Sequence, residues 1–151
     1  MNYEIEYYQP HNQYIKIKAT FDVANLNATT VTFPTWRPGR YQLADFSKNI
    51  NHWKVLDADN KQIVSTKTSK NEWLIDTSNT KQIVITYQYY ANVINAGSTY
   101  MDDTQLYVNP VNCLAYIKEQ QLNSCELKVT IPNDFEIASG IPFENNILKT
   151  K

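Results

Sequence analysis

The residues best suited to chemistry lie in segment 95–105, which is polar without an obvious structural need. It contains Tyr100, Asp102 and Asp103, whose hydroxyl and carboxylates are potential ligands for a substrate amine. Neighbouring side chains of an extended chain point to opposite faces, so the two carboxylates are not expected to act as a pair. Two interpretations follow: a solvated loop capped by its own side chains, or an amine-binding or specificity loop.

The common catalytic and metal-binding motifs are missing from the chain. Only two histidines, His11 and His52, are present, and they cannot form the H-E-x-x-H motif of zinc hydrolases, so we interpret both as hydrogen-bonded structural residues. There is no G-x-S-x-G elbow, and the three glycines cannot build a phosphate-binding loop. We therefore predict no catalytic residue and no metal site, although a triad assembled from distant positions stays open.

Composition restricts the classes of partner. The formal net charge of −1, from 14 basic and 15 acidic residues, provides no field that would attract nucleic acid or anionic lipid. No apolar run approaches the roughly 20 residues of a membrane helix, so we expect a soluble chain with no nucleic-acid or membrane partner. The compartment stays open between cytoplasmic and, if a signal peptide was removed, periplasmic or secreted.

Alternating apolar and polar residues must supply the elements that position these side chains. Segments 14–23, 82–91 and 125–131 alternate with the period of half-buried strands. Shorter strand candidates are 3–9, 29–33, 52–56, 62–66, 72–75, 105–108 and 113–117, and helical turns are expected only near 45–50 and 119–122. The pattern predicts an all-β fold, an antiparallel β-sandwich of two packed sheets in one domain, residues 1–151.

Segment 33–41 is a second unusual feature, an aromatic corner containing Pro38-Gly39. This dipeptide suits the centre of a type II turn. We expect Phe33, Trp36 and Tyr41 to anchor the corner on a core; a ligand-contacting aromatic patch is the alternative. Its arginines, at positions 37 and 40, should point to solvent or to a carboxylate.

Two cysteines complete the inventory of reactive groups. Cys113 and Cys125 flank a stretch that we expect to form a hairpin. Either two free thiols or a cross-strand disulfide bridge is compatible with this placement.

Several segments, taken in order, resemble one family. Pro10-His11, the corner at 34–41, and segments 45–50, 89–91, 100–103, 109–110 and 131–142 are similar to the opening of the glycyl-aminopeptidase-like zinc metallopeptidases that carry a PDZ module. The resemblance covers essentially the whole chain, and Trp36, Pro38, Gly39 and Tyr41 are its most specific part.

The resemblance implies a role for the chain. It would be the non-catalytic N-terminal β-sandwich domain, a fragment of a longer metallopeptidase whose absent catalytic domain carries the H-E-x-x-H motif and the zinc. Its partners would be that catalytic domain and a peptide substrate at the interface between them, with Tyr100, Asp102 and Asp103 as candidate substrate-binding residues. One departure is Gly97, which stands where the family often has an arginine.

A carbohydrate-binding β-sandwich is the alternative of a different class. Its motivation is aromatic richness, with Trp36, Trp53 and Trp73 available to stack on sugar rings.

Overall fold

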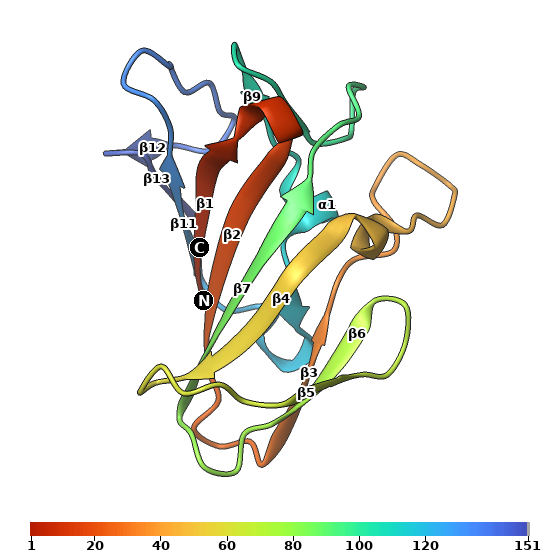
Figure 1. Ribbon diagram of the computed structural model, residues 1–151, viewed down its shortest axis with the longest axis vertical. Coiled ribbons are helices and arrows are strands. Elements are labelled where there is room, and N and C mark those ends of the chain that lie inside the picture. The colour runs from red at the N-terminus through yellow and green to blue at the C-terminus, as the bar shows by residue number, and fades with distance from the viewer. Residues whose placement is uncertain (151) are drawn as a thin grey trace.

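The computed structural model describes residues 1–150 and confirms the predicted all-β fold (Figure 1). The strands are β1 (Asn2–Gln9), β2 (Tyr14–Asp22), β3 (Ala28–Thr32), β4 (Ile50–Asp57), β5 (Ser65–Lys67), β6 (Glu72–Asp76), β7 (Gln82–Tyr90), β8 (Tyr100–Met101), β9 (Leu106–Tyr107), β10 (Tyr116–Ile117), β11 (Cys125–Thr130), β12 (Phe143–Glu144) and β13 (Ile147–Thr150). The helical elements are short: η1 (Pro10–Asn12), η2 (Phe46–Asn49), α1 (Pro110–Cys113) and η3 (Lys118–Gln120).

Two sheets build the sandwich. The larger has seven strands in the order β12-β13-β11-β1-β2-β7-β4, and the smaller has four in the order β10-β3-β6-β5. A separate hairpin pairs β8 with β9. All pairings between the strands are antiparallel except that of β1 with β11, which is parallel. The antiparallel sandwich prediction is therefore confirmed, with one parallel pair that alternation could not reveal.

The core lies between the sheets and follows from strand alternation. Every second residue of β2 and β7 is fully buried, and the residues between them face outward. Phe33, just after β3, packs edge-on against Tyr87 of β7 and Trp73 of β6, with ring centroids 5.3 Å and 5.5 Å apart. Burial of each such side chain contributes roughly 1.5–3 kcal/mol.

Two short strands lie elsewhere than expected. The strand expected at 62–66 is β5, shifted to Ser65–Lys67, because Gln62 makes only an isolated bridge to Leu56. The strand expected at 113–117 is shortened to β10, because Asn109 caps a helical turn at Pro110–Cys113 by accepting a hydrogen bond from the Val111 amide. The two predicted helical turns are confirmed as η2 and η3.

The corner at 33–41 is only partly as predicted. Gly39 has a φ of +81°, and the Arg40 amide donates to the Arg37 carbonyl at 3.3 Å, as the expected turn requires. The expectation that Trp36 and Tyr41 are buried is wrong, because they are 47 % and 94 % exposed. A hydrogen bond from the Ala44 amide to the Thr35 carbonyl closes the loop, which projects away from the sheets and leaves only Phe33 in the core.

The two cysteines are free thiols. Cys113 ends α1 and is buried, and burial raises the pKa of its thiol to about 12. Cys125 begins β11 and is half-buried. The expected hairpin between them is absent from residues 113–125, because η3 intervenes and the flanking strands belong to different sheets.

Candidate functional site

The segments singled out by the sequence gather at one end of the sandwich, which we call the loop end (upper part of Figure 1). Here β1 and β7 finish and β2 and β4 begin, as the pairings Gln9 with Tyr14, Tyr14 with Tyr90 and Ile50 with Tyr89 show. The loop end comprises residues 10–13, 33–49, 91–99, 102–105 and 131–142. These loops contain five of the six prolines and all three glycines of the chain.

Exposed apolar side chains concentrate at this end. Of the twelve large hydrophobic residues that are exposed among residues 1–150, nine lie in or beside its loops. They are Tyr8, Trp36, Tyr41, Leu43, Val93, Ile94, Tyr107, Ile141 and Phe143. A contiguous exposed apolar patch is typical of an interaction surface, whereas isolated exposed apolar residues are not.

Asp102 organises the turn between β8 and β9. Its Oδ1 accepts hydrogen bonds from the Thr104 amide and hydroxyl, both at 2.8 Å, and from the Gln105 amide at 2.9 Å. Its Oδ2 accepts from the Tyr100 hydroxyl at 3.1 Å. The bonds from Thr104, with those from Tyr100 and Gln105, lower the pKa of Asp102 to about 2, and the bond to Asp102 raises the pKa of Tyr100. Asp102 is thus a charged cap of its own loop.

Asp103 differs from its neighbour. It is exposed, and within residues 1–150 its side chain makes no hydrogen bond or ion pair. Of the three candidate substrate-binding residues, the structure brings Tyr100 and Asp102 into direct contact and leaves Asp103 facing solvent.

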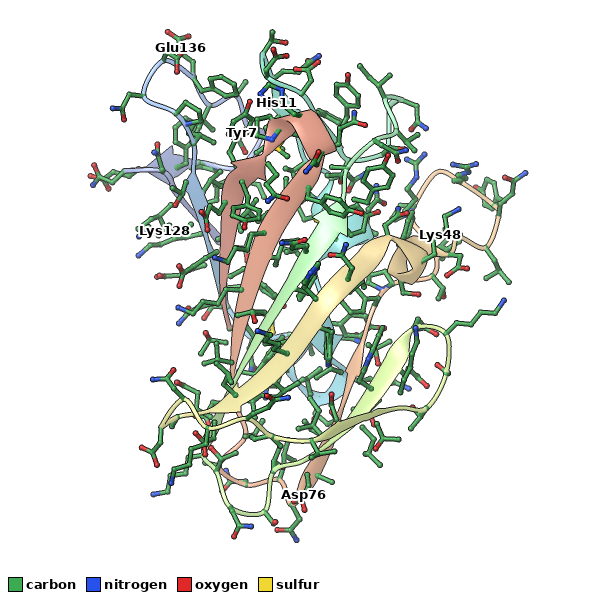
Figure 2. All side chains as sticks on the ribbon, in the orientation of Figure 1. Tyr7, His11, Lys48, Asp76, Lys128 and Glu136 are labelled. Carbon is green, nitrogen blue, oxygen red and sulfur yellow. The ribbon has the colours of Figure 1, made fainter. Side chains whose placement is uncertain are left out.

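Tyr7 joins this turn to the loop at 131–142, a role that no pattern in the sequence indicated. Its hydroxyl donates to the Asp102 carbonyl at 2.7 Å, and its ring packs edge-on against Phe135 at 5.1 Å. Desolvation raises the pKa of Tyr7, and the charges of Asp103, Asp102 and Asp134 raise it further. Figure 2 labels Tyr7, His11 and Glu136, all three in the part of the view that contains the loop end.

Arg37 reaches across the loop end to Gly97. A Cβ atom placed on Gly97 would lie 1.8 Å from Nη1 and 1.9 Å from Cζ of Arg37, so the guanidinium occupies the space of a side chain at position 97. The sequence marked Gly97 as a departure from a family pattern, but nothing in the chain between the two residues indicated this contact.

An apolar groove of about 400 Å³ lies beside these loops, between β11, β13 and the loop at 131–142. Leu127, Val129, Phe135, Ile137 and Leu148 are among its lining residues. Alternate residues of β11 are only half-buried, whereas the corresponding residues of β2 are fully buried. The inner face of β11 is therefore incompletely covered by residues 1–150.

The histidines and acidic residues do not converge on a metal site. Within residues 1–150, no group of three His, Cys, Asp or Glu side chains is placed to hold a metal ion. His11 and His52 are exposed and make no side-chain hydrogen bond to the described part of the chain, so the expectation of hydrogen-bonded histidines is wrong. No helix among the described residues is long and apolar enough to span a membrane.

Comparison with known proteins assigns the domain. Residues 2–149 match the family model of the peptidase M61 N-terminal domain. The chain belongs to this family. The expectation of an N-terminal domain from a glycyl-aminopeptidase-like metallopeptidase is thereby confirmed.

A solved structure supports the fold of this M61 N-terminal domain. Among five matching chains is an aminopeptidase N family protein from Idiomarina loihiensis, with a TM-score of 0.85 and 23 % sequence identity. The match covers 99 % of the M61 N-terminal domain and 26 % of the other chain, so the domain spans about a quarter of that protein's length. The comparison with curated proteins gave no match.

Two of the three tryptophans that the carbohydrate-binding alternative needs are buried or half-buried. Trp53 and Trp73 stack on each other with ring centroids 4.6 Å apart, and Trp73 is buried in the core. Among the tryptophans, only Trp36 is exposed.

Proposed function

We propose that the chain is the non-catalytic N-terminal domain of a longer zinc aminopeptidase-like peptidase, and that its loop end packs on the catalytic domain. The proposal rests chiefly on the nine exposed apolar side chains gathered at that end. Zinc and the catalytic residues would belong to the catalytic domain. The loop end would form one wall of its substrate cleft.

The apolar groove is the proposed seat for a segment of the catalytic domain. Its walls are mostly aliphatic and aromatic, and its volume of about 400 Å³ can accommodate several apolar side chains. The matched solved protein is about four times as long as the domain, so a longer polypeptide of that kind would contain further domains that could occupy the groove. Covering the inner face of β11 would complete the burial that β2 and β7 already have.

The turn between β8 and β9 is the proposed contact with substrate. Asp102 is engaged by four hydrogen bonds and would hold the turn in shape, with Tyr100 as its partner. Asp103 is the carboxylate left available for the amino group of a peptide. Asp102 and Tyr100 would thus position the turn, and Asp103 would bind the substrate.

The gene offers the first test of this proposal. The reading frame is expected to continue beyond Lys151 into a segment encoding H-E-x-x-H, and a stop codon shortly after Lys151 would refute the proposal. The isolated domain is expected to hydrolyse no Gly-X dipeptide with added zinc.

Docking is tested by producing the domain and the remainder of the polypeptide as separate chains. Val129→Lys in the groove should weaken their association about tenfold or more, since it places a charge in an apolar interface. Val64→Lys is the matched control, because Val64 is 82 % exposed at the opposite end. Equal association of the two variants, each shown to be folded by circular dichroism, would refute docking at the groove.

A further inference from the structure

We infer that Arg37, seated on Gly97, binds the C-terminal carboxylate of a short peptide. The inference rests on the proposed function, because it assigns one part of the peptide substrate to one residue of the loop end.

The first observation is the position of the Arg37 guanidinium against Gly97, which we call the seat. Nη1, Cζ and Nη2 of Arg37 would lie 1.8 Å, 1.9 Å and 2.3 Å from a Cβ atom on Gly97. Three guanidinium atoms are therefore close to one point, and the group covers the backbone of Gly97. Any side chain at position 97 would displace it, so the glycine is needed for the observed position of Arg37.

The second observation is that Arg37 lacks an acceptor. The three ion pairs within residues 1–150 are Lys16–Glu6, Lys18–Glu4 and Lys149–Glu126, and none involves Arg37. Its guanidinium also donates no hydrogen bond to this part of the chain, although the residue is half-buried. A partly desolvated cation without an acceptor is unfavourable until an anion binds to it.

The third observation is a rigid polar support beneath the seat. The Gly97 carbonyl accepts from Nδ2 of Asn112 at 2.7 Å and from Nδ2 of Asn109 at 3.1 Å. Asn112 is 1 % exposed, and its Oδ1 finds no donor within residues 1–150. Gly97 therefore connects a guanidinium without an acceptor to a buried amide oxygen without a donor. Simple packing does not account for this arrangement.

The chemistry of the ligand follows from the guanidinium and its neighbours. A guanidinium presents a planar fork of donors that matches a carboxylate with two parallel hydrogen bonds. Trp36 precedes Arg37 and is 47 % exposed, and Val93 and Ile94 are exposed in the loop that contains Gly97. A carboxylate next to an apolar side chain fits this surface, as at the C-terminus of Gly-Leu.

The test is a titration of the ¹⁵N-labelled chain with Gly-Leu, followed by NMR. The Gly97 amide and the Trp36 indole signals should shift and saturate. Gly-Leu amide, which lacks the terminal negative charge, should bind about tenfold or more weakly, as expected for loss of a hydrogen bond between charged groups.

Arg40 provides a matched control on the same turn, because it is exposed and, within residues 1–150, its guanidinium donates a hydrogen bond only to Gln42, at 3.4 Å. Arg37→Gln should weaken Gly-Leu binding about tenfold, whereas Arg40→Gln should leave it unchanged. Should Arg37→Gln fail to fold, Arg37→Lys keeps the charge without the fork and should bind with reduced affinity.

Three results would overturn the inference: no shift at high peptide concentration, equal binding of Gly-Leu and its amide, or equal losses in the two arginine variants. If Arg37→Gln alters only association with the catalytic domain, the carboxylate comes from protein and the peptide site is refuted. Docking at the groove would survive all of these results, since Val129→Lys tests it separately.

Discussion

The two ends of the sandwich differ in the residues that form their turns and loops. At the end opposite the loop end, polar turns are capped by aspartates: Asp22, Asp57 and Asp76 accept backbone hydrogen bonds from residues two positions ahead at 2.8–2.9 Å. The loop end instead contains five of the six prolines, all three glycines and most of the large apolar side chains that are exposed among residues 1–150. One end presents polar turns that cap themselves, whereas the other displays apolar side chains that residues 1–150 leave uncovered.

Asp102 shows that the difference is not one of turn chemistry. It caps its turn at the loop end as the three aspartates do at the opposite end. What distinguishes the loop end is therefore the apolar residues that its loops display, such as Val93 and Ile94. Turn geometry and interaction surface are separate properties of these segments.

The largest expected effect is the difference in stability lost when Phe33 and Trp36, both in the loop end, are each replaced by alanine. Phe33→Ala should destabilise the chain by about 3–5 kcal/mol, because it opens a cavity among Tyr87, Trp73 and Trp53. Trp36→Ala should cost less than about 1 kcal/mol, since nearly half of Trp36 is exposed and it lies outside the core. Urea unfolding monitored by circular dichroism measures both. Similar costs would mean that Trp36 anchors the corner after all.

A smaller effect compares backbone conformation at the two ends. Gly39 at the loop end and Asn60 at the opposite end both have positive φ, +81° and +62°. Gly39→Ala should cost about 1–2 kcal/mol, and Asn60→Ala about 1 kcal/mol, because alanine is strained in this region.

Gly140 is the control for these substitutions. Its φ is not in the positive region, and a Cβ atom there would meet nothing within 4 Å. Gly140→Ala should therefore be neutral or stabilising by up to about 1 kcal/mol. Thermal unfolding of the three variants tests the comparison, and a loss at Gly140 equal to that at Gly39 would contradict it.

The sequence predicted the long strands because each has one face on a core. Alternation in β2 and β7 is a local signal of that burial. The parallel pairing of β1 with β11 joins residues more than 120 positions apart, such as Asn2 and Glu126, and no local pattern encodes it. Trp36 and Tyr41 were misplaced for a related reason: side-chain type indicates a tendency to be buried, but not whether a facing layer exists.

The candidate site was predictable to a similar extent. The polarity of segment 95–105 marked it as a candidate site, and a loop capped by its own side chains was one of the two interpretations. Asp102 agrees with that interpretation, because it accepts hydrogen bonds from Thr104 in the same turn. The contact between Arg37 and Gly97 spans 60 positions and depends on how two loops meet. Such contacts arise from the fold and leave no trace in residue spacing.

The smallest expected effect is a comparison of acid sensitivity at Asp102 and Asp76. Hydrogen bonds lower the pKa of both carboxyls, that of Asp102 to about 2, so each stabilises the fold above the unfolded pKa near 3.8. This contribution is lost as the pH falls through the folded pKa. Asp102→Asn and Asp76→Asn should therefore lower the melting temperature at pH 7 and reduce its dependence on pH between about 4 and 2.

The pKa of each carboxyl can be measured directly from its ¹³C chemical shift. A larger depression of the pKa at Asp102 than at Asp76 is expected, because the Tyr100 phenol and the Gln105 amide are donors that Asp76 lacks. Tyr100→Phe should raise the pKa of Asp102 toward that of Asp76. An unchanged value would show that Thr104 and Gln105 alone hold the charge, and Tyr100 would then be free to contact a substrate. Asp102 stays ionised at neutral pH in either case, so any proton donated to a substrate at this turn must come from another group.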